Sequence, residues 1–336
     1  MKVLKTSKLK AVFNKLSDSA ELYVPMLKDY QSAFYSWKTY DENKDELLLD
    51  VLNVELPPKD FVLPQTERLY NFKQEGMEIK IEEIKEQVNP RILFGARSCD
   101  VRAIDHFDQV FLTRGYDDIA YKTRRDSLTI IANACYKPGP NCFCESMGVS
   151  PTEIESADII LREYSEEGYI WEAKTAKGEE ITELIADFLE EEEVKLPELE
   201  PFLRQVEYDG VAEKLKGMFE DPIWDRLSAP CQNCGICTYV CPTCYCFDIQ
   251  VKTWGDEGYR FRCWDSCMYR EYTKMAGGHN PRELSKERFR NRFLHKLQFF
   301  PERYGPSLCT GCGRCIVACP VGINIATIIQ DIKEAE

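Results

Sequence analysis

The sequence predicts a protein of α+β or α/β class in two parts, a mixed α/β domain followed by a cysteine-rich module. The chain has 336 residues, 44% of them hydrophobic, which is enough for two domains with separate cores. Short apolar runs typical of strands alternate with helical patterns before residue 200. Four of the 16 cysteines lie between residues 99 and 144, and the other twelve lie between 231 and 319. We therefore expect one domain over residues 1–222 and a second over residues 223–336.

The charge and the apolar pattern limit where the protein works and what it binds. The formal net charge of -14 disfavours nucleic acid as a partner. No apolar run approaches the ~20 residues of a membrane helix, so we expect no membrane insertion. The N-terminus carries lysines throughout and lacks an apolar leader core, which predicts a cytoplasmic protein. Cysteines in a reducing compartment indicate metal ligation in preference to disulfides.

The first part of the chain alternates strand and helix patterns. Residues 2–16 have helical spacing with a basic face, and no site is expected before residue 90. Residues 91–95 read as a buried strand that enters a helix over 101–111, with Asp100 as its N-cap. The remaining expected elements are strands over 20–25, 33–35, 128–134, 157–161 and 169–172 and a helix over 181–188.

Two copies of one cysteine motif lie in the second part. They read Cys231-x2-Cys234-x2-Cys237-x3-Cys241-Pro242 and Cys309-x2-Cys312-x2-Cys315-x3-Cys319-Pro320. This is the ligand spacing of two-cluster bacterial ferredoxins, in which the fourth cysteine of each motif binds the other cluster. The spacing therefore predicts a ferredoxin-like module with two [4Fe–4S] clusters. The first site would comprise Cys231, Cys234, Cys237 and Cys319, and the second site Cys309, Cys312, Cys315 and Cys241.

Zinc is the alternative metal for closely spaced cysteine ligands. A zinc site needs four ligands around one ion, and two CxxC pairs supply them. Here a unit of four cysteines and a proline occurs twice, with Gly235 and Gly313 at matching places in the loops. This repetition favours iron–sulfur clusters.

A third set of thiols follows the expected strands of the first domain. Cys99 follows the strand over 91–95, Cys135 follows the strand over 128–134, and Cys142 and Cys144 lie in the next loop. The carboxyl ends of parallel strands share one edge of a sheet, so these thiols can converge. We expect them to hold a third [4Fe–4S] cluster, with zinc or unligated structural thiols as alternatives. Arg97, Arg102, Arg124 and Arg125 are either counter-charges for this cluster or solvated surface residues.

An insert over residues 242–308 separates the two ferredoxin-like motifs and is expected to be largely helical. Cys244, Cys246, Cys263 and Cys267 could bind a further metal or be buried neutral thiols, and the second interpretation is favoured because no cluster template matches. Residues 282–303 predict an amphipathic helix with a strongly basic face. That face could be solvated, could dock a partner, or could supply counter-charge for the clusters.

Several segments resemble the iron–sulfur subunit family of cytoplasmic sulfhydrogenases (the beta subunit) and anaerobic sulfite reductases (the A subunit), with related chains in flavin-based transhydrogenases. These segments are Gly95–Asp100, Cys142–Gly148, Cys241–Asp248, Trp264–Cys267 and Ala276–Arg282. The resemblance covers residues 90–336, and the family pattern does not require a cysteine at 263. It implies a subunit that relays electrons between a flavin- and NAD(P)H-handling partner and a terminal redox subunit, with a ferredoxin as a further partner.

The residues themselves favour electron transfer over catalysis. The sequence has no G-x-G-x-x-G after a strand, no P-loop and no serine or cysteine triad, and it contains three histidines. We expect no flavin or NAD in this chain and no catalytic residue. Clusters ligated only by cysteine pass single electrons and offer no open iron to a substrate. The alternative is a stand-alone flavin or iron–sulfur reductase with its substrate site in the N-terminal domain, with flavin near Gly95.

Overall fold

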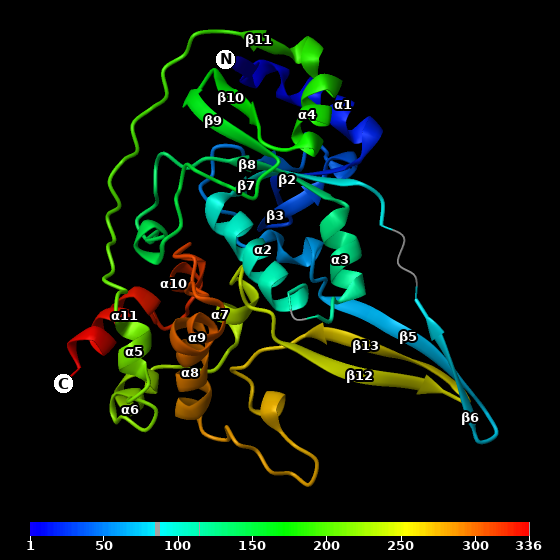
Figure 1. Cartoon of the computed structure of the whole chain (residues 1–336), viewed down its shortest axis with the longest axis vertical. Coiled ribbons are helices and arrows are strands. Elements are labelled where there is room, and N and C mark those ends of the chain that lie inside the picture. The colour runs from blue at the N-terminus through cyan, green and yellow to red at the C-terminus, as the bar shows by residue number, and fades with distance from the viewer. Residues whose placement is uncertain (85–87, 114, 336) are drawn as a thin grey trace.

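A nine-stranded mixed sheet forms the centre of the first domain in the computed structural model, which describes residues 1–84, 88–113 and 115–335 (Figure 1). Its order is β11-β1-β10-β9-β8-β7-β2-β3, with β4 paired to β2. Strands β2, β7, β8 and β9 run parallel to one another, and the other pairs are antiparallel. The strands are β1 (Lys2–Lys5), β2 (Glu21–Lys28), β3 (Gln31–Ser36), β4 (Glu46–Leu47), β7 (Arg91–Arg97), β8 (Leu128–Asn133), β9 (Ile159–Ser165), β10 (Gly168–Ala173) and β11 (Leu189–Glu191).

Helices cover both faces of this sheet, which explains why its central strands are apolar throughout. Alternate residues of β7 enter two separate cores: Ile92 and Phe94 pack in the core that contains α1, and Leu93 packs in the core that contains α2 and α3. Figure 1 shows α1 and α4 on one side of the sheet and α2 and α3 on the other. These helices are α1 (Leu9–Ser19), α2 (Ser98–Phe111), α3 (Ile119–Asp126) and α4 (Ala176–Leu184).

The expected strands of this domain are present, but two expected helices differ from the prediction. The helix expected over 181–188 is α4, which ends at Leu184 and is followed by a 3-10 turn, Ala186–Phe188. Residues 2–5 form β1 between β10 and β11 in place of the first turn of a helix. Val3 and Leu4 are fully buried there. Burial between two strands outweighs the helical spacing of residues 2–16, since propensity is a weak determinant when tertiary packing opposes it.

A second, four-stranded antiparallel sheet joins the two halves of the chain. Its order is β12-β13-β5-β6, and it extends away from the rest of the molecule (Figure 1). The strands are β5 (Thr66–Glu75), β6 (Glu78–Glu83), β12 (Phe247–Trp254) and β13 (Glu257–Trp264). The insert therefore begins with a hairpin and is helical only in its later part. Buried Glu67 of β5 pairs with Arg124 of α3 and with Arg262 of β13, which fixes this sheet to the first domain.

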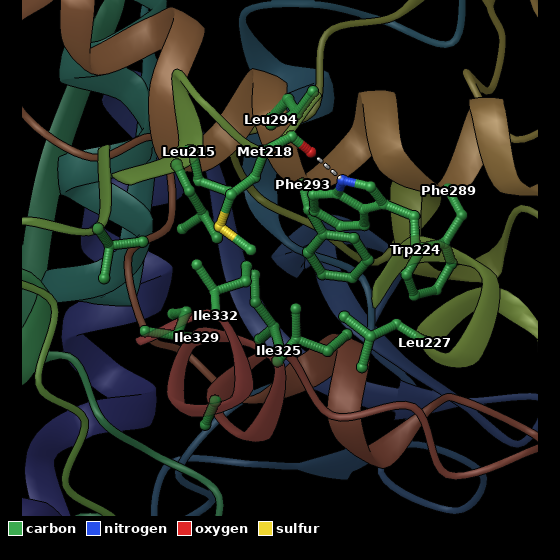
Figure 2. Packing of buried hydrophobic residues seen from close by; sticks show 14 of the residues in the cluster. Leu215, Met218, Trp224, Leu227, Phe289, Phe293, Leu294, Ile325, Ile329 and Ile332 are labelled. Carbon is green, nitrogen blue, oxygen red and sulfur yellow. Dashed lines mark hydrogen bonds between the residues drawn. The ribbon is translucent and has the colours of Figure 1, made fainter. Parts of the chain in front are cut away.

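The C-terminal module is built from short helices around one apolar core (Figure 2). Trp224, Phe289, Phe293, Ile325 and Ile329 pack in it, and the Trp224 indole donates a hydrogen bond to the Met218 carbonyl at 2.6 Å. The helices are α5 (Val211–Leu215), α6 (Ile223–Ser228), α7 (Ile236–Tyr239), α8 (Ser285–Leu294), α9 (Phe300–Tyr304), α10 (Arg314–Val317) and α11 (Ile325–Glu334), with a π-helical segment, His295–Phe299, between α8 and α9. Helix α5, which lies before residue 222, also packs in this core. The domain boundary after residue 222 stays a prediction. Within the described residues, no helix has the length and apolar character needed to cross a bilayer.

Candidate metal centres

The two cysteine motifs fold into matching loops. Gly235 and Gly313 both precede a short helix, α7 or α10, with the same backbone angles, φ 77° and ψ -13°. This left-handed conformation favours glycine. At Gly313 a Cβ atom would also lie 2.6 Å from the carbonyl oxygen of Asn141, so the loop touches the first domain too closely for any side chain. The sequence repeat is therefore a structural repeat.

The four thiols predicted for the first site line a single pocket between these loops. Cys231, Cys234, Cys237 and Cys319 are all on its wall, together with Arg292. Backbone N–H groups of Asn233 and Ile323 donate to the sulfurs of Cys231 and Cys319, at 3.5 and 3.2 Å. Burial raises the pKa of Cys231, and the negative charges of the other three thiolates raise it further. Cys319 of the second loop, like Cys315, therefore lines the same pocket as the three thiols of the first loop.

Cys241 of the first loop lies near the thiols of the second loop. Burial raises the pKa of Cys309 to about 11, and the nearby charges of Cys241 and Cys312 add to this shift. The pKa of Cys315 is also raised, by burial first and then by Cys241, Cys309 and Cys312. Four thiols that would repel one another as free thiolates need cations between them, and iron supplies these in a cluster.

The donor set fits iron–sulfur clusters. A zinc ion needs four ligands at about 2.0–2.3 Å from one point, whereas a four-iron cluster holds each thiolate on a different iron. Both sites are composed of thiols, and each can take one cluster. When bound, a cluster accepts or donates one electron.

The four thiols predicted for a third site lie where the sheet meets the second loop. Cys99 is in the first turn of α2 after β7, and Cys135 follows the parallel neighbour β8. The sulfur of Cys142 lies 4.0 Å from the carbonyl oxygen of Cys312. Burial raises the pKa of Cys144 to about 12, with further contributions from Cys142 and Cys135. Cys99, Cys135, Cys142 and Cys144 (the third site) are therefore neighbours of the second site.

The cations near the third site differ from the expectation. Arg124 pairs with Glu67, and Arg125 with Asp108, so neither faces the cysteines. Of the arginines expected there, Arg97 does act on a thiol of this set, by lowering the pKa of Cys135 against the larger effect of burial. Sequence reasoning missed Arg314, whose charge acts on Cys99, Cys142 and Cys312.

Asp100 is not the N-cap of α2, in contrast to the prediction. The helix begins at Ser98 and the capping position is Arg97. Asp100 instead accepts two hydrogen bonds from the guanidinium of Arg314, at 2.7 and 3.0 Å, and both side chains are buried. This bidentate ion pair connects the sheet domain to the second loop.

The insert brings three of its four cysteines together. The β12–β13 hairpin pairs Phe247 with Trp264, so its two ends place Cys246 beside Cys267. A hydrogen bond from Cys267 lowers the pKa of Cys246 to about 6, and Cys244 lies beside Cys241. Cys263 pairs with Asp248 across the hairpin, away from this group.

The basic helix is not a solvated docking surface. Arg288, Arg290, Arg292 and Lys296 are at most 9% exposed, and their apolar neighbours Phe289, Phe293 and Leu297 are buried too. Arg288 donates to the backbone carbonyls of Met268, Arg282 and Glu283. Other elements of the C-terminal module pack around the helix. The basic pattern therefore marks buried cations, which is the opposite of the usual solvated charged face.

His106 is buried, His295 is partly buried, and both are neutral. Burial lowers the pKa of His106 and of His295 to about 4, so both are uncharged at pH 7. His295 shares a hydrogen bond with the Tyr245 hydroxyl at 3.1 Å, and His106 lies 3.4 Å from Gln109. Their environment is that of packed core residues.

Comparison with known proteins agrees with this geometry. Residues 230–323 match the family described as "4Fe-4S dicluster domain". The chain is 31% identical over 334 residues to sulfhydrogenase 2 subunit beta of Pyrococcus furiosus, with 96% of this chain and 95% of that protein covered. The chain belongs to the iron–sulfur beta-subunit family. The dicluster match lies on the C-terminal module. The similarity to the sulfhydrogenase subunit covers nearly the whole chain, so it includes the sheet domain as well. No solved structure matches it.

Proposed function

We propose that this beta-family chain is the electron-transfer subunit of a multi-subunit oxidoreductase of the hydrogenase type. The observation that supports the proposal is that Cys319 of the second loop lines one pocket with the thiols of the first loop, while Cys241 of the first loop lies near the thiols of the second. In this arrangement the first and second sites are adjacent, as successive one-electron carriers must be. The family membership and the four-iron dicluster match support the same conclusion.

The third site would extend the series to the sheet domain. Its thiols adjoin Cys312 of the second site, so the order along the molecule is third, second, first. Both ends of the series reach the surface. Cys234 of the first site is exposed, and Cys135 lines an open groove with Arg97 and Tyr136. Two surface openings suit a relay with a donor at one end and an acceptor at the other.

The partners we propose are a subunit that handles flavin and NAD(P)H and a terminal redox subunit. The relative from Pyrococcus furiosus is by name a subunit of a sulfhydrogenase, which supports a hydrogenase-type assembly. A fully cysteine-ligated cluster cannot accept a hydride. A cofactor that accepts two electrons as hydride and releases them one at a time is therefore needed between NAD(P)H and this chain.

Redox titration of the isolated, cluster-loaded chain tests the relay. We expect two or three [4Fe–4S] signals by EPR and no turnover when NAD(P)H is the only reductant. The control is reduction by dithionite, which should develop all of the signals. Sustained NAD(P)H oxidation, or one flavin per chain, would instead establish a stand-alone reductase.

The third cluster is tested by Cys142→Ser with iron and sulfide counting. The variant should lose about four iron atoms per chain, because a four-iron cluster needs its thiolates and Cys142 is one of four. Cys263→Ser is the matched control, since Cys263 pairs with Asp248 in the hairpin and no other cysteine is among the groups that act on its thiol. Unchanged iron in the Cys142 variant would leave these thiols a structural role.

A further inference from the structure

Three buried cations lie beside the first and second sites. Lys59, Arg292 and Lys296 are 4%, 5% and 2% exposed. None of them forms an ion pair with a carboxylate in the part of the chain that the structure describes. Burying a charge costs several kcal/mol unless an opposite charge or hydrogen bonds compensate it. The negative groups that act most on Arg292 and Lys296 are cysteine thiols.

Lys296 touches a ligand of the second site directly. Its Nζ lies 3.2 Å from the sulfur of Cys241 and donates to the hydroxyl of Thr243 at 2.8 Å. Lys296 belongs to the π-helical segment between α8 and α9, the kind of local widening that is frequent at functional sites. Through Cys241 the ammonium acts on the second site, and no thiol of the first site is among the groups that affect it most.

Arg292 lies between the two sites. It donates to the carbonyl of Cys237 at 3.2 Å and lines the pocket of the first site. The thiols that act on it most strongly are Cys237 of the first site and Cys315 of the second. Its Nη1 atom is buried and has no hydrogen-bond partner among the described residues. A guanidinium held open in this way can donate to a bound anionic group.

Lys59 reaches the same region from the first domain. Its Nζ donates to the carbonyls of Thr238 and Cys244, at 3.0 and 3.1 Å, and lies 4.2 Å from the centre of the Trp264 ring. These contacts are to carbonyl oxygens and a ring. Burial lowers the pKa of Lys59, and the nearby thiols of Cys244, Cys241 and Cys246 oppose this shift. Lys59, from the sheet domain, is therefore a third basic side chain beside Arg292 of α8 and Lys296 of the π-helical segment.

We infer that Lys296 and Arg292 are positioning residues that set the two reduction potentials, with Lys296 acting on the second cluster alone and Arg292 acting on both. This inference rests on the proposed electron-transfer function. Reduction adds one negative charge to a cluster, and a nearby fixed cation stabilises that form. Lys296 thereby raises the potential of the second cluster relative to the first, which favours residence of the electron on the second cluster.

Potentiometric EPR titration of full-length, cluster-loaded variants tests this assignment. Lys296→Met should lower the midpoint potential of the second cluster and leave that of the first nearly unchanged. Arg292→Met should lower both. Lys296→Arg and Arg292→Lys keep the charge and should restore most of each shift, which a purely structural role would not require. Lys59→Met, which removes a cation held on carbonyls instead of on a ligand sulfur, should lower the second midpoint by a smaller amount.

Two controls distinguish a loss of bound cluster from a change in its midpoint potential. Iron content shows whether each variant is loaded, and Lys274→Met removes an exposed lysine of the same module, so it should shift neither midpoint. If Lys296→Met does not load, Arg292→Met and Lys59→Met still decide the question. Loaded variants with unchanged or raised midpoints would overturn the inference while the electron-transfer function stands. Absence of [4Fe–4S] signals from the unaltered, reconstituted chain would instead overturn the function itself.

Discussion

Replacing Cys237 by alanine should remove about one four-iron cluster, roughly four iron atoms per chain, and interrupt electron flow through the first site. Cys237 lines the pocket of that site together with Cys231, Cys234 and Cys319. Alanine offers no ligand, so one iron would lose its protein bond. Iron and sulfide analysis, with EPR at the potential of each cluster, measures the loss. The variant also identifies which signal belongs to the first site.

Cys263→Ser is the control for this experiment as well. Cys263 pairs with Asp248 across the β12–β13 hairpin, and no other cysteine is among the groups that act on its thiol, so the iron content should stay unchanged. If Cys237→Ala retains all of its iron and every EPR signal, Cys237 is not a cluster ligand and the assignment of the first site is wrong. If Cys263→Ser also loses iron, the loss reflects general misfolding.

Replacing Arg314 by methionine should destabilise the chain by about 3–5 kcal/mol, because it leaves a buried carboxylate unpaired. Arg314 makes the bidentate ion pair with Asp100 and donates from Nε to the carbonyl of Val54 at 2.7 Å. Asp100 is 1% exposed and cannot reach water in place of the lost partner. Urea unfolding of the loaded protein, followed by tryptophan fluorescence, measures the change in the free energy of unfolding.

Two variants show whether the cost comes from the unpaired charge. Asp100→Leu combined with Arg314→Met should recover a large part of the stability, since an apolar pair replaces the ion pair. Arg226→Met breaks an exposed pair with Asp331 and should cost about 1 kcal/mol or less. An equal loss in the single and double variants would contradict the ion-pair explanation.

The cluster motifs and the strand–helix alternation could be predicted from the sequence because both are local patterns. Cys231–Pro242 and Cys309–Pro320 each carry their ligand spacing within one short segment, and strands such as β7 and β8 are continuous apolar runs. The resemblance to the iron–sulfur beta-subunit family is confirmed by the similarity over nearly the whole chain. The dicluster prediction agrees with the family match over residues 230–323.

The features that could not be predicted depend on contacts between distant residues. Arg314 and Asp100 are 214 positions apart, and their pairing has no local signal. The basic pattern of residues 282–303 resembles a solvated face, and only the fold shows that Arg288, Arg292 and Lys296 are enclosed. Their enclosure follows from α5, α6 and α11 packing around α8, which a helical periodicity alone does not reveal.

The pairing of β5 with β13 affects how the protein can assemble. Residues 66–75 and 257–264 are neighbours in space, so the strand between the cysteine motifs finds its partner only after most of the chain has been synthesised. Such a high contact order predicts slow folding, during which β13 is an unprotected edge open to aggregation. A fragment that begins at residue 223 keeps every thiol of the two ferredoxin-like motifs, but it lacks β5 and so leaves one edge of β13 unpaired. We therefore expect the intact chain to aggregate less than this fragment when the cluster-loaded protein is produced.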